Sequence, residues 1–221
     1  MQSRPIEIPV DGGVLIGELT AGPGARGLVV FAHGSGSSSK SPRNQYVAKA
    51  IQQEGLATLL FDLLTESEQE SVSKRFDIPL LTERLLHSLT WVGRQPEVAR
   101  LPVGLFGAST GAAAALKAAA TLDGLVQAVV SRGGRTDLAG DSVAEVVSPT
   151  LLIVGGKDNE VLELNRRTLG ALRCEKRLAV VPGATHLFEE PGALKEVSSV
   201  AALWLRSHLR RGRAESEGAH A

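Results

Sequence analysis

Short runs of apolar residues alternate along this chain with stretches in which apolar residues recur at the helical period. A continuous apolar run is typical of a strand in a parallel sheet, because helices bury such a strand on both faces. The alternation therefore predicts an α/β fold with a mostly parallel sheet and helices on both faces. The runs expected to form strands are residues 27–33, 56–62, 101–107, 125–131, 149–156 and 177–183.

The segments between these runs predict the helices. Pro42 suits the first turn of a helix that Gly55 ends. Residues 63–77 are polar and are expected to form a loop over the sheet. The apolar stripe of the first helix is expected at Tyr46, Val47, Ala50 and Ile51, and further helices at 76–92, 110–121, 160–172 and 193–209.

The two ends of the chain differ from its middle. Asp11-Gly12-Gly13 stands between two alternating stretches and predicts an antiparallel hairpin at the N-terminal edge of the sheet. The last residues, 210–221, are polar and small, so we expect a disordered tail. Between the ends there is no repeat, no linker and no insertion long enough for a large lid domain. Residues 1–209 are therefore expected to form a single domain.

Composition narrows the class of partner. Twenty-four Lys and Arg balance twenty-four Asp and Glu, so no overall field attracts nucleic acid or anionic lipid. Neither a signal peptide nor a run of roughly 18 apolar residues is present, which favours a cytoplasmic protein without membrane contact. Cys174 is the single cysteine, which excludes an internal disulfide and a cysteine-based metal site. A small or uncharged partner is expected, such as a small-molecule ester, and oligomeric state is left open.

The stretch "LPVGLFGASTGAAAALKAAA" places Ser109 where a buried strand meets an alanine-rich helix with almost no linker. Its frame, Gly107-x-Ser109-x-Gly111, is the nucleophile-elbow pattern. Such a turn exposes the serine hydroxyl above the sheet, and glycines on both sides let the flanking backbones come close. A helix-capping serine in a tight turn is the alternative interpretation. The strand–turn–helix context favours the nucleophile.

A nucleophilic serine needs a base and an acid that orients the base. Asp158 follows the strand at 149–156, and His186 follows the strand at 177–183. The order Ser, Asp, His, each at the carboxyl end of a strand, is the order that accompanies the elbow. Asp158 could instead cap a helix, and Asp137, one strand earlier, is the alternative acid. The sequence predicts a Ser109–His186–Asp158 triad.

The oxyanion of such a reaction needs hydrogen-bond donors. The backbone N–H of Thr110, at the start of the helix, is one candidate. After the strand at 27–33, "HGSGSSS" offers the N–H groups of Ser35 or Gly36. His33 is expected to hold this loop by hydrogen bonds rather than to act as the base.

These motifs, together with "GGKDNEV" and "GATHLF", resemble the α/β-hydrolase superfamily, and specifically its small dienelactone hydrolase-like members. The resemblance spans about residues 5–209 and implies an eight-stranded sheet and hydrolysis of esters or lactones without a cofactor. Thioesters would fit the same catalytic groups, and no residues with metal-ligand spacing are seen, so no metal is expected. Dienelactone hydrolases proper use a cysteine nucleophile, whereas this chain has Ser109 at that position. The departure puts the dienelactone substrate in doubt but not the acyl-transfer chemistry.

Two other functions remain open. Gly34-x-Gly36-x-x-Ser39 nearly matches the dinucleotide-binding fingerprint, with Asp62 as the ribose-binding acid, but the third glycine is missing. A ligand-binding protein without catalysis on a hydrolase fold is the second alternative. Arg132 and Arg135 could bind an acidic group of the substrate or pair with nearby aspartates, and Arg43 has the same two possibilities.

Overall fold

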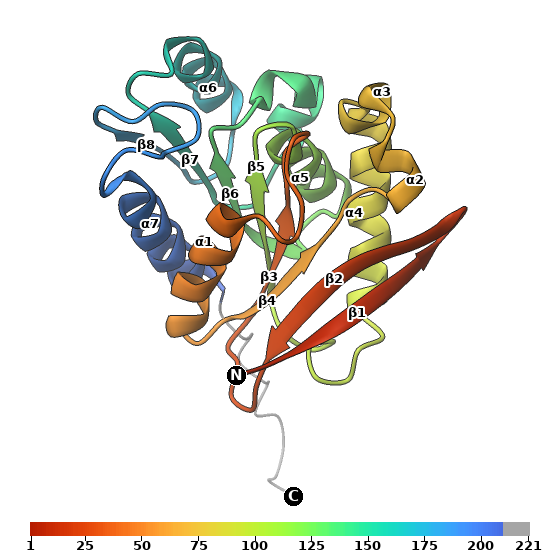
Figure 1. The fold of residues 1–221 in the computed structure, drawn as a ribbon. Helices are drawn as coiled ribbons and strands as arrows, with labels where there is room; N and C mark the ends of the chain where they lie inside the picture. Colours follow the sequence, from red (N-terminus) through yellow and green to blue (C-terminus); the bar gives the residue numbers. More distant parts are fainter. Residues whose placement is uncertain (210–221) are drawn as a thin grey trace, which may run out of the picture.

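An eight-stranded sheet lies at the centre of residues 1–209, the part of the chain that the computed structural model describes (Figure 1). The strand order is β1-β2-β4-β3-β5-β6-β7-β8. β1 and β2 form the expected hairpin and pair antiparallel, as do β2 and β4, and all later pairs are parallel. The strands are β1 (Gln2–Val10), β2 (Gly13–Ala21), β3 (Leu28–Ala32), β4 (Ala57–Phe61), β5 (Val103–Ala108), β6 (Val126–Arg132), β7 (Thr150–Gly155) and β8 (Lys176–Val181).

Helices cover both faces of this sheet, as the continuous apolar strands predicted. On one face, α1 (Pro42–Gln53) and α7 (Ala193–His208) lie side by side (Figure 1). On the other face, α4 (Ile78–Val92) packs against α5 (Thr110–Thr121). The helix α6 (Asn159–Ala171) packs on β7 and β8. Each face has its own apolar core, with Leu59 in one and Phe106 in the other.

Several local expectations were wrong. Residues 63–77 contain two short helices, α2 (Glu66–Gln69) and α3 (Val72–Arg75), and a 3-10 helix, η1 (Thr136–Glu145), follows β6. Phe76 is exposed and lies outside α4, because that helix begins after Asp77, whose side chain accepts a hydrogen bond from the backbone N–H of Leu80. Tyr46 of α1 is exposed, while Ala48 is buried in the apolar stripe. The expected disordered tail lies outside the described residues.

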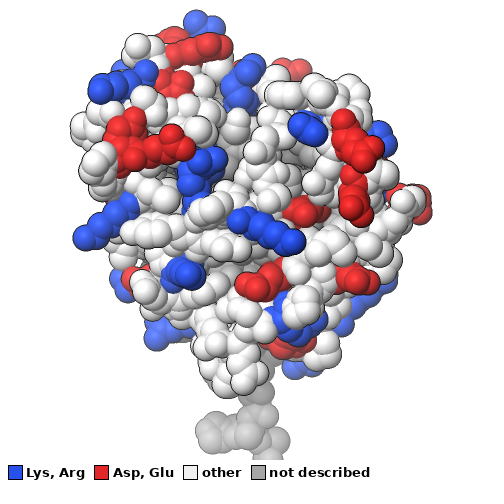
Figure 2. Space-filling model, viewed as in Figure 1, with Lys and Arg blue, Asp and Glu red and all other residues white. Residues whose placement is uncertain are grey.

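The surface has no extended region of one sign on the face that Figure 2 shows, where basic and acidic side chains are interspersed. Among the described helices, none combines the length and the apolar character that crossing a bilayer requires. The described residues also contain no cluster of three or more His, Cys, Asp or Glu side chains arranged to hold a metal ion.

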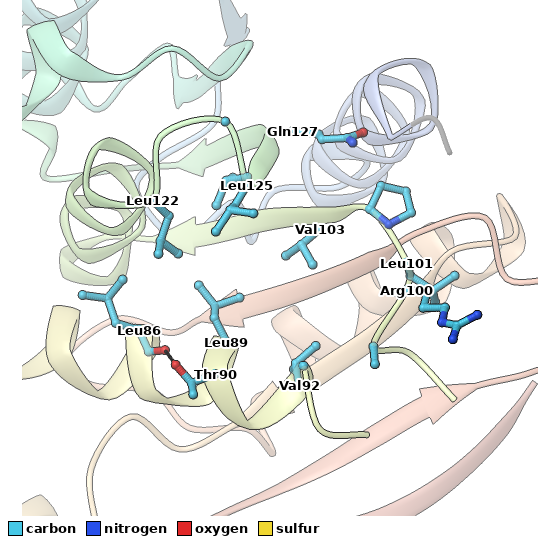
Figure 3. Close-up of a pocket in the computed structure, with 15 residues that line it drawn as sticks. Leu86, Leu89, Thr90, Val92, Arg100, Leu101, Val103, Leu122, Leu125 and Gln127 are labelled. Carbon is cyan, nitrogen blue, oxygen red and sulfur yellow. Dashed lines mark hydrogen bonds between the residues drawn. The ribbon is translucent and has the colours of Figure 1, made fainter. Parts of the chain in front are cut away.

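Two cavities lie at opposite ends of β5 and β6. The larger, about 730 Å³, lies at the starts of these strands and is lined largely by leucine and valine side chains, among them Leu86, Leu89, Val103 and Leu122 (Figure 3). The smaller, about 220 Å³, lies beyond their carboxyl ends and is lined by Ser109 and His186. The candidate site is at this second end.

Candidate active site

Ser109 occupies the sharp turn between β5 and α5. Its backbone has φ 50° and ψ −121°, a region that non-glycine residues rarely adopt. The turn is held by hydrogen bonds from the backbone N–H of Ser109 to the Arg132 carbonyl and from the N–H of Arg135 to the Ser109 carbonyl, both 3.1 Å. Strain that the surrounding structure maintains in this way is typical of functional residues.

The two glycines of the motif are required by close backbone contacts. A Cβ at Gly107 would lie 2.5 Å from the Cα of Ala112, in the first turn of α5. A Cβ at Gly111 would overlap the carbonyl oxygens of Ala32 and His33, at the end of β3. These positions let β5, α5 and the end of β3 approach one another around the serine. The elbow geometry expected from the sequence is present.

Asp158 and His186 are brought together from the ends of neighbouring strands. The Nδ1 of His186 lies 2.6 Å from the Oδ2 of Asp158. The carboxylate side chain is 14% exposed and the imidazole 38% exposed, so one is sheltered while the other faces the pocket. Asp158 stands at the N-cap of α6, but its side chain makes no capping hydrogen bond. The helix-capping interpretation is therefore wrong for its carboxylate.

The loop that carries His186 is fixed on both sides of the imidazole. The carboxylate of Glu190 accepts a 3.0 Å hydrogen bond from the backbone N–H of Thr185. Phe188 is 1% exposed in the core beneath α7 and has φ 55°, so its burial anchors a strained loop. A Cβ at Gly133 would lie 3.4 Å from the Cε1 of His186, which shows how closely the loop after β6 approaches the ring.

Asp137, the alternative acid, is engaged elsewhere. Its carboxylate accepts hydrogen bonds from the Nε and Nη2 of Arg135 at 2.9 and 2.8 Å. The hydrogen bond from Arg135 holds the pKa of Asp137 below its ordinary value. Of the two possibilities for Arg135, the structure therefore has the pairing with an aspartate. The carboxylate that accepts a hydrogen bond from the imidazole of His186 is that of Asp158.

The loop after β3 passes directly beside the serine. A Cβ at Gly34 would lie 3.0 Å from the Cβ of Ser109, a tight contact that shows how near this backbone comes to the serine. Ser35 and Gly36 follow and line the same pocket as Ser109 and His186. Thr110, the other candidate donor, is buried as the first residue of α5, where free backbone N–H groups point out of a helix.

His33 holds this loop in place. Its Nε2 accepts a 3.0 Å hydrogen bond from the backbone N–H of Leu63, so its Nδ1–H donates to the Gly34 carbonyl at 2.9 Å. Burial lowers the pKa of His33, which favours this neutral form. Asp62 accepts a 2.6 Å hydrogen bond from the N–H of Ser39 at the far end of the loop. Asp62 therefore fastens the loop, which is not the role a ribose-binding acid would have.

The pocket around Ser109 is small and partly basic. Its lining includes Arg132, from the end of β6, and Arg43, from the first turn of α1. A neighbouring cavity of about 150 Å³ is lined by the same loop at Gly34. It extends to Gln69 of α2, Arg75 of α3 and Leu81 of α4. The sequence did not predict these walls, because residues 63–77 were expected to be a loop without helices.

The comparison with protein families agrees with this geometry. A family described as "Alpha/beta hydrolase domain" matches residues 25–196. The chain belongs to the alpha/beta hydrolase family. Within that family it is dienelactone hydrolase-like: the crystal structure of a dienelactone hydrolase from Anabaena variabilis matches it with a TM-score of 0.91 and 51% identity, over 95% of this chain and 99% of that one.

A structure with lower sequence identity and a longer protein also match. Est1E from Butyrivibrio proteoclasticus matches with a TM-score of 0.80 and 16% identity over 92% of this chain and 98% of that one, a likeness of fold. A Mycobacterium tuberculosis protein (strain H37Rv) that carries a phosphoribosyl transferase name is 58% identical over 193 residues, 87% of this chain but 44% of that protein. The chain thus spans less than half the length of this curated relative.

Proposed function

We propose that this chain is a serine hydrolase that cleaves carboxylic esters, lactones or thioesters through an acyl-enzyme. The observation that carries the proposal is the 2.6 Å contact between Asp158 and His186, in a pocket whose lining includes both His186 and Ser109. Membership of the alpha/beta hydrolase family supports hydrolysis in general. The ester substrate and the catalytic roles are part of the proposal.

The proposed mechanism gives one role to each of these three side chains. His186 takes the proton of Ser109 as the hydroxyl oxygen attacks the substrate carbonyl carbon. Asp158 holds the imidazole in the tautomer whose Nδ1–H faces the carboxylate, and it stabilises the imidazolium that forms. The tetrahedral intermediate then collapses, and His186 returns its proton to the leaving alcohol, thiol or hydroxyl end of an opened lactone. The acyl group remains on Ser109.

The oxyanion is bound by backbone N–H groups of Thr110 and Ser35, with Gly36 as the alternative in the second loop. Thr110 is the first residue of α5, and the dipole at a helix N-terminus favours negative charge. Water then attacks the acyl-enzyme with His186 again as base, the bond between Ser109 and the acyl group breaks, the acid is released, and His186 returns the proton to Ser109. All catalytic groups in this cycle belong to the chain, and the only added reactant is water, so the proposal includes no metal or organic cofactor.

The test uses a fluorophosphonate probe and a series of p-nitrophenyl esters of increasing acyl length. We expect a covalent adduct on the peptide that contains Ser109 and fastest turnover of short acyl groups, because the pocket measures about 220 Å³. If the probe labels no serine and no ester is hydrolysed, the proposal is overturned and a non-catalytic binding protein is favoured. The Ser109→Ala variant is the control for labelling at other serines.

Phosphoribosyl transfer is not proposed for this chain, although a relative carries that name. The shared region is 44% of that relative, so the name describes a protein with more than this region. Assaying the chain for pyrophosphate release from phosphoribosyl pyrophosphate checks this separately from the ester assay.

A further inference from the structure

Asn165 is a buried polar residue of α6 that has no role in the cycle described above. Its side chain is 0% exposed, and its Nδ2 donates to the carbonyls of Gly134 and Val161, both at 2.8 Å. Because both partners are carbonyl oxygens, only the NH₂ end of the amide can face them. The bond to Val161 lies within α6, whereas the bond to Gly134 joins α6 to the loop after β6.

This loop, from Gly133 to Arg135, borders both the base and the nucleophile of the proposed triad. The backbone N–H of Arg135 donates to the Ser109 carbonyl at 3.1 Å. A Cβ at Gly133 would lie 3.4 Å from the Cε1 of His186 and 3.5 Å from its Nδ1. A displacement of the loop would therefore reach both Ser109 and His186.

The loop is held by hydrogen bonds to its backbone. A Cβ at Gly134 would lie 2.7 Å from the Cβ of Ala112, in the first turn of α5, so this position has no room for a side chain that could anchor the loop. The N–H of Gly133 donates to the Ile153 carbonyl of β7 at 2.7 Å, and Asn165 donates to the loop from α6. Asn165 is thus the side chain that fixes the carbonyl in the middle of the loop.

The helix that carries Asn165 also begins at the acid of the proposed triad. Asp158 is the N-cap of α6, about two turns before Asn165. The Oδ1 of Asn165 is buried without a hydrogen-bond partner among the described residues. An unpartnered buried acceptor is destabilising, so it offsets part of what the two donated bonds contribute. The amide therefore supplies a defined position of the Gly134 carbonyl more than it supplies stability.

We propose that Asn165 is a positioning residue for the acyl transfer proposed above. Through the Gly134 carbonyl it fixes the loop after β6, and this loop keeps the imidazole of His186 aligned with the hydroxyl of Ser109. The inference rests on the proposed function for its effect on the reaction rate, but the alignment of the imidazole does not require turnover.

The kinetic test replaces the amide by an apolar side chain of similar size. Asn165→Leu removes the donor to the Gly134 carbonyl, so the loop should shift and misalign His186. We expect kcat on the wild type's best p-nitrophenyl ester to fall by about 10-fold to 10²-fold, the range expected for a small misplacement of reacting groups. KM should change by less than about twofold, because position 165 does not line the pocket around Ser109. Labelling by the fluorophosphonate probe should slow by a similar factor.

Ser148→Ala is the matched control, because it removes a buried hydrogen bond to a carbonyl at the other end of β6. The Oγ of Ser148 donates to the Val126 carbonyl at 2.6 Å, and the residue is 3% exposed. Its melting temperature should fall as for Asn165→Leu, whereas kcat should stay within about twofold of the wild type. Asn165→Ala is a second variant, which removes the amide without adding bulk, and the same loss of kcat is expected for it.

A spectroscopic measurement distinguishes failure of this inference from failure of the proposed function. The proton between the Nδ1 of His186 and the Oδ2 of Asp158, which lie 2.6 Å apart, should give a downfield ¹H resonance in the wild type and in Ser148→Ala. In Asn165→Leu and Asn165→Ala we expect this resonance to shift or broaden. A changed resonance without ester turnover in the wild type would retain the positioning role and reject the hydrolase proposal.

The opposite results would reject the inference and retain the hydrolase proposal. If the wild type hydrolyses esters and both variants at position 165 lose only melting temperature, as Ser148→Ala does, Asn165 is a structural residue. If their kcat falls while the resonance stays unchanged, Asn165 does not act through His186, and the alignment proposed here is wrong.

Discussion

The two ends of β5 and β6 present opposite kinds of cavity. At the starts of the strands, a cavity of about 730 Å³ is walled mainly by leucine and valine side chains such as Leu86 and Leu89 (Figure 3). At their carboxyl ends, a pocket of about 220 Å³ holds Ser109, His186 and Arg132. The smaller cavity, not the larger one, is lined by the strained Ser109 and by two arginines with unpartnered buried N–H groups, and the proposed chemistry is assigned to it for that reason. In open parallel sheets this is the expected end, because the loops after the strands converge there.

The strongest test of this comparison is Ser109→Ala. We expect the variant to lose about 10⁶-fold in kcat on a good ester, as losses of a nucleophilic serine can reach that size. The free energy of unfolding should change little, because the side chain faces the pocket and alanine keeps the same backbone connections. Single-turnover and steady-state assays with the wild type's best p-nitrophenyl ester measure the effect. Retention of a tenth of the activity would move the nucleophile elsewhere.

The next largest effect is expected for Asp158→Asn. The amide keeps the shape of the side chain but favours the wrong imidazole tautomer at His186, a change that costs roughly 10⁴-fold in a serine protease triad. Asp137→Asn is the matched control, because that carboxylate pairs with Arg135 rather than with an imidazole. We expect the control to retain most of its kcat near neutral pH. The opposite ranking in parallel assays would transfer the role of acid to position 137.

His33 allows a test of how the free energy of unfolding depends on pH at the carboxyl ends of the strands. Burial lowers the pKa of His33 from the ordinary value of 6.5, so the unfolded chain binds this proton more tightly than the folded one. The contribution of neutral His33 is therefore complete above about pH 6.5 and is lost as the pH falls below that value. His33→Gln can still accept from the N–H of Leu63, and it does not titrate. Urea unfolding between about pH 7.5 and about pH 5.5 should show a shallower loss for the variant.

An equal slope for wild type and His33→Gln would contradict this account, since it would mean that the imidazole is protonated alike in both states. The carboxyl groups whose pKa values are lowered, such as Glu97 and Asp137, lose their contributions only at more acidic pH. Their titration therefore does not obscure the slope in this pH range.

Most of the fold could be predicted because each central strand is a continuous apolar run, a signal contained within a few residues. The helices of residues 63–77 were missed because their stabilisation is not periodic. Thr65 and Glu68 form a capping box, and Glu68 also accepts from the buried Arg84 at 3.0 Å. The spacing Thr-x-x-Glu was visible in the sequence and could have indicated α2. The ion pair between Glu68 and Arg84, which are 16 residues apart, could not be inferred from the sequence.

The candidate site also has one part that could be predicted from the sequence and one part that could not. The elbow around Ser109 could be predicted because both of its glycines lie within two residues of the serine, although Gly107 is required by the first turn of α5 and Gly111 by the end of β3. The state of Arg132 depends on distant segments: its guanidinium lies over Phe106 of β5, in a pocket that is also lined by Arg43 of α1 and Leu187 of the loop after β8. Sequence alone left open whether Arg132 was paired, because nothing near it along the chain determines which carboxylates reach it.

The smallest effect is expected at the other end of the strands, for Leu125→Ser. Leu125 lines the larger cavity and is 70% exposed, so replacing it removes apolar surface without opening the core. The free energy of unfolding should change by no more than about 0.5 kcal/mol, as for most surface substitutions. The kcat/KM on short esters should stay within about twofold of the wild type, because the side chain belongs to the end of the sheet remote from Ser109. Urea unfolding and the p-nitrophenyl ester series measure both quantities on the same preparation. A large rise in KM with unchanged stability would instead mean that the apolar cavity binds substrate. The assignment of substrate binding to the carboxyl ends of the strands alone would then be wrong.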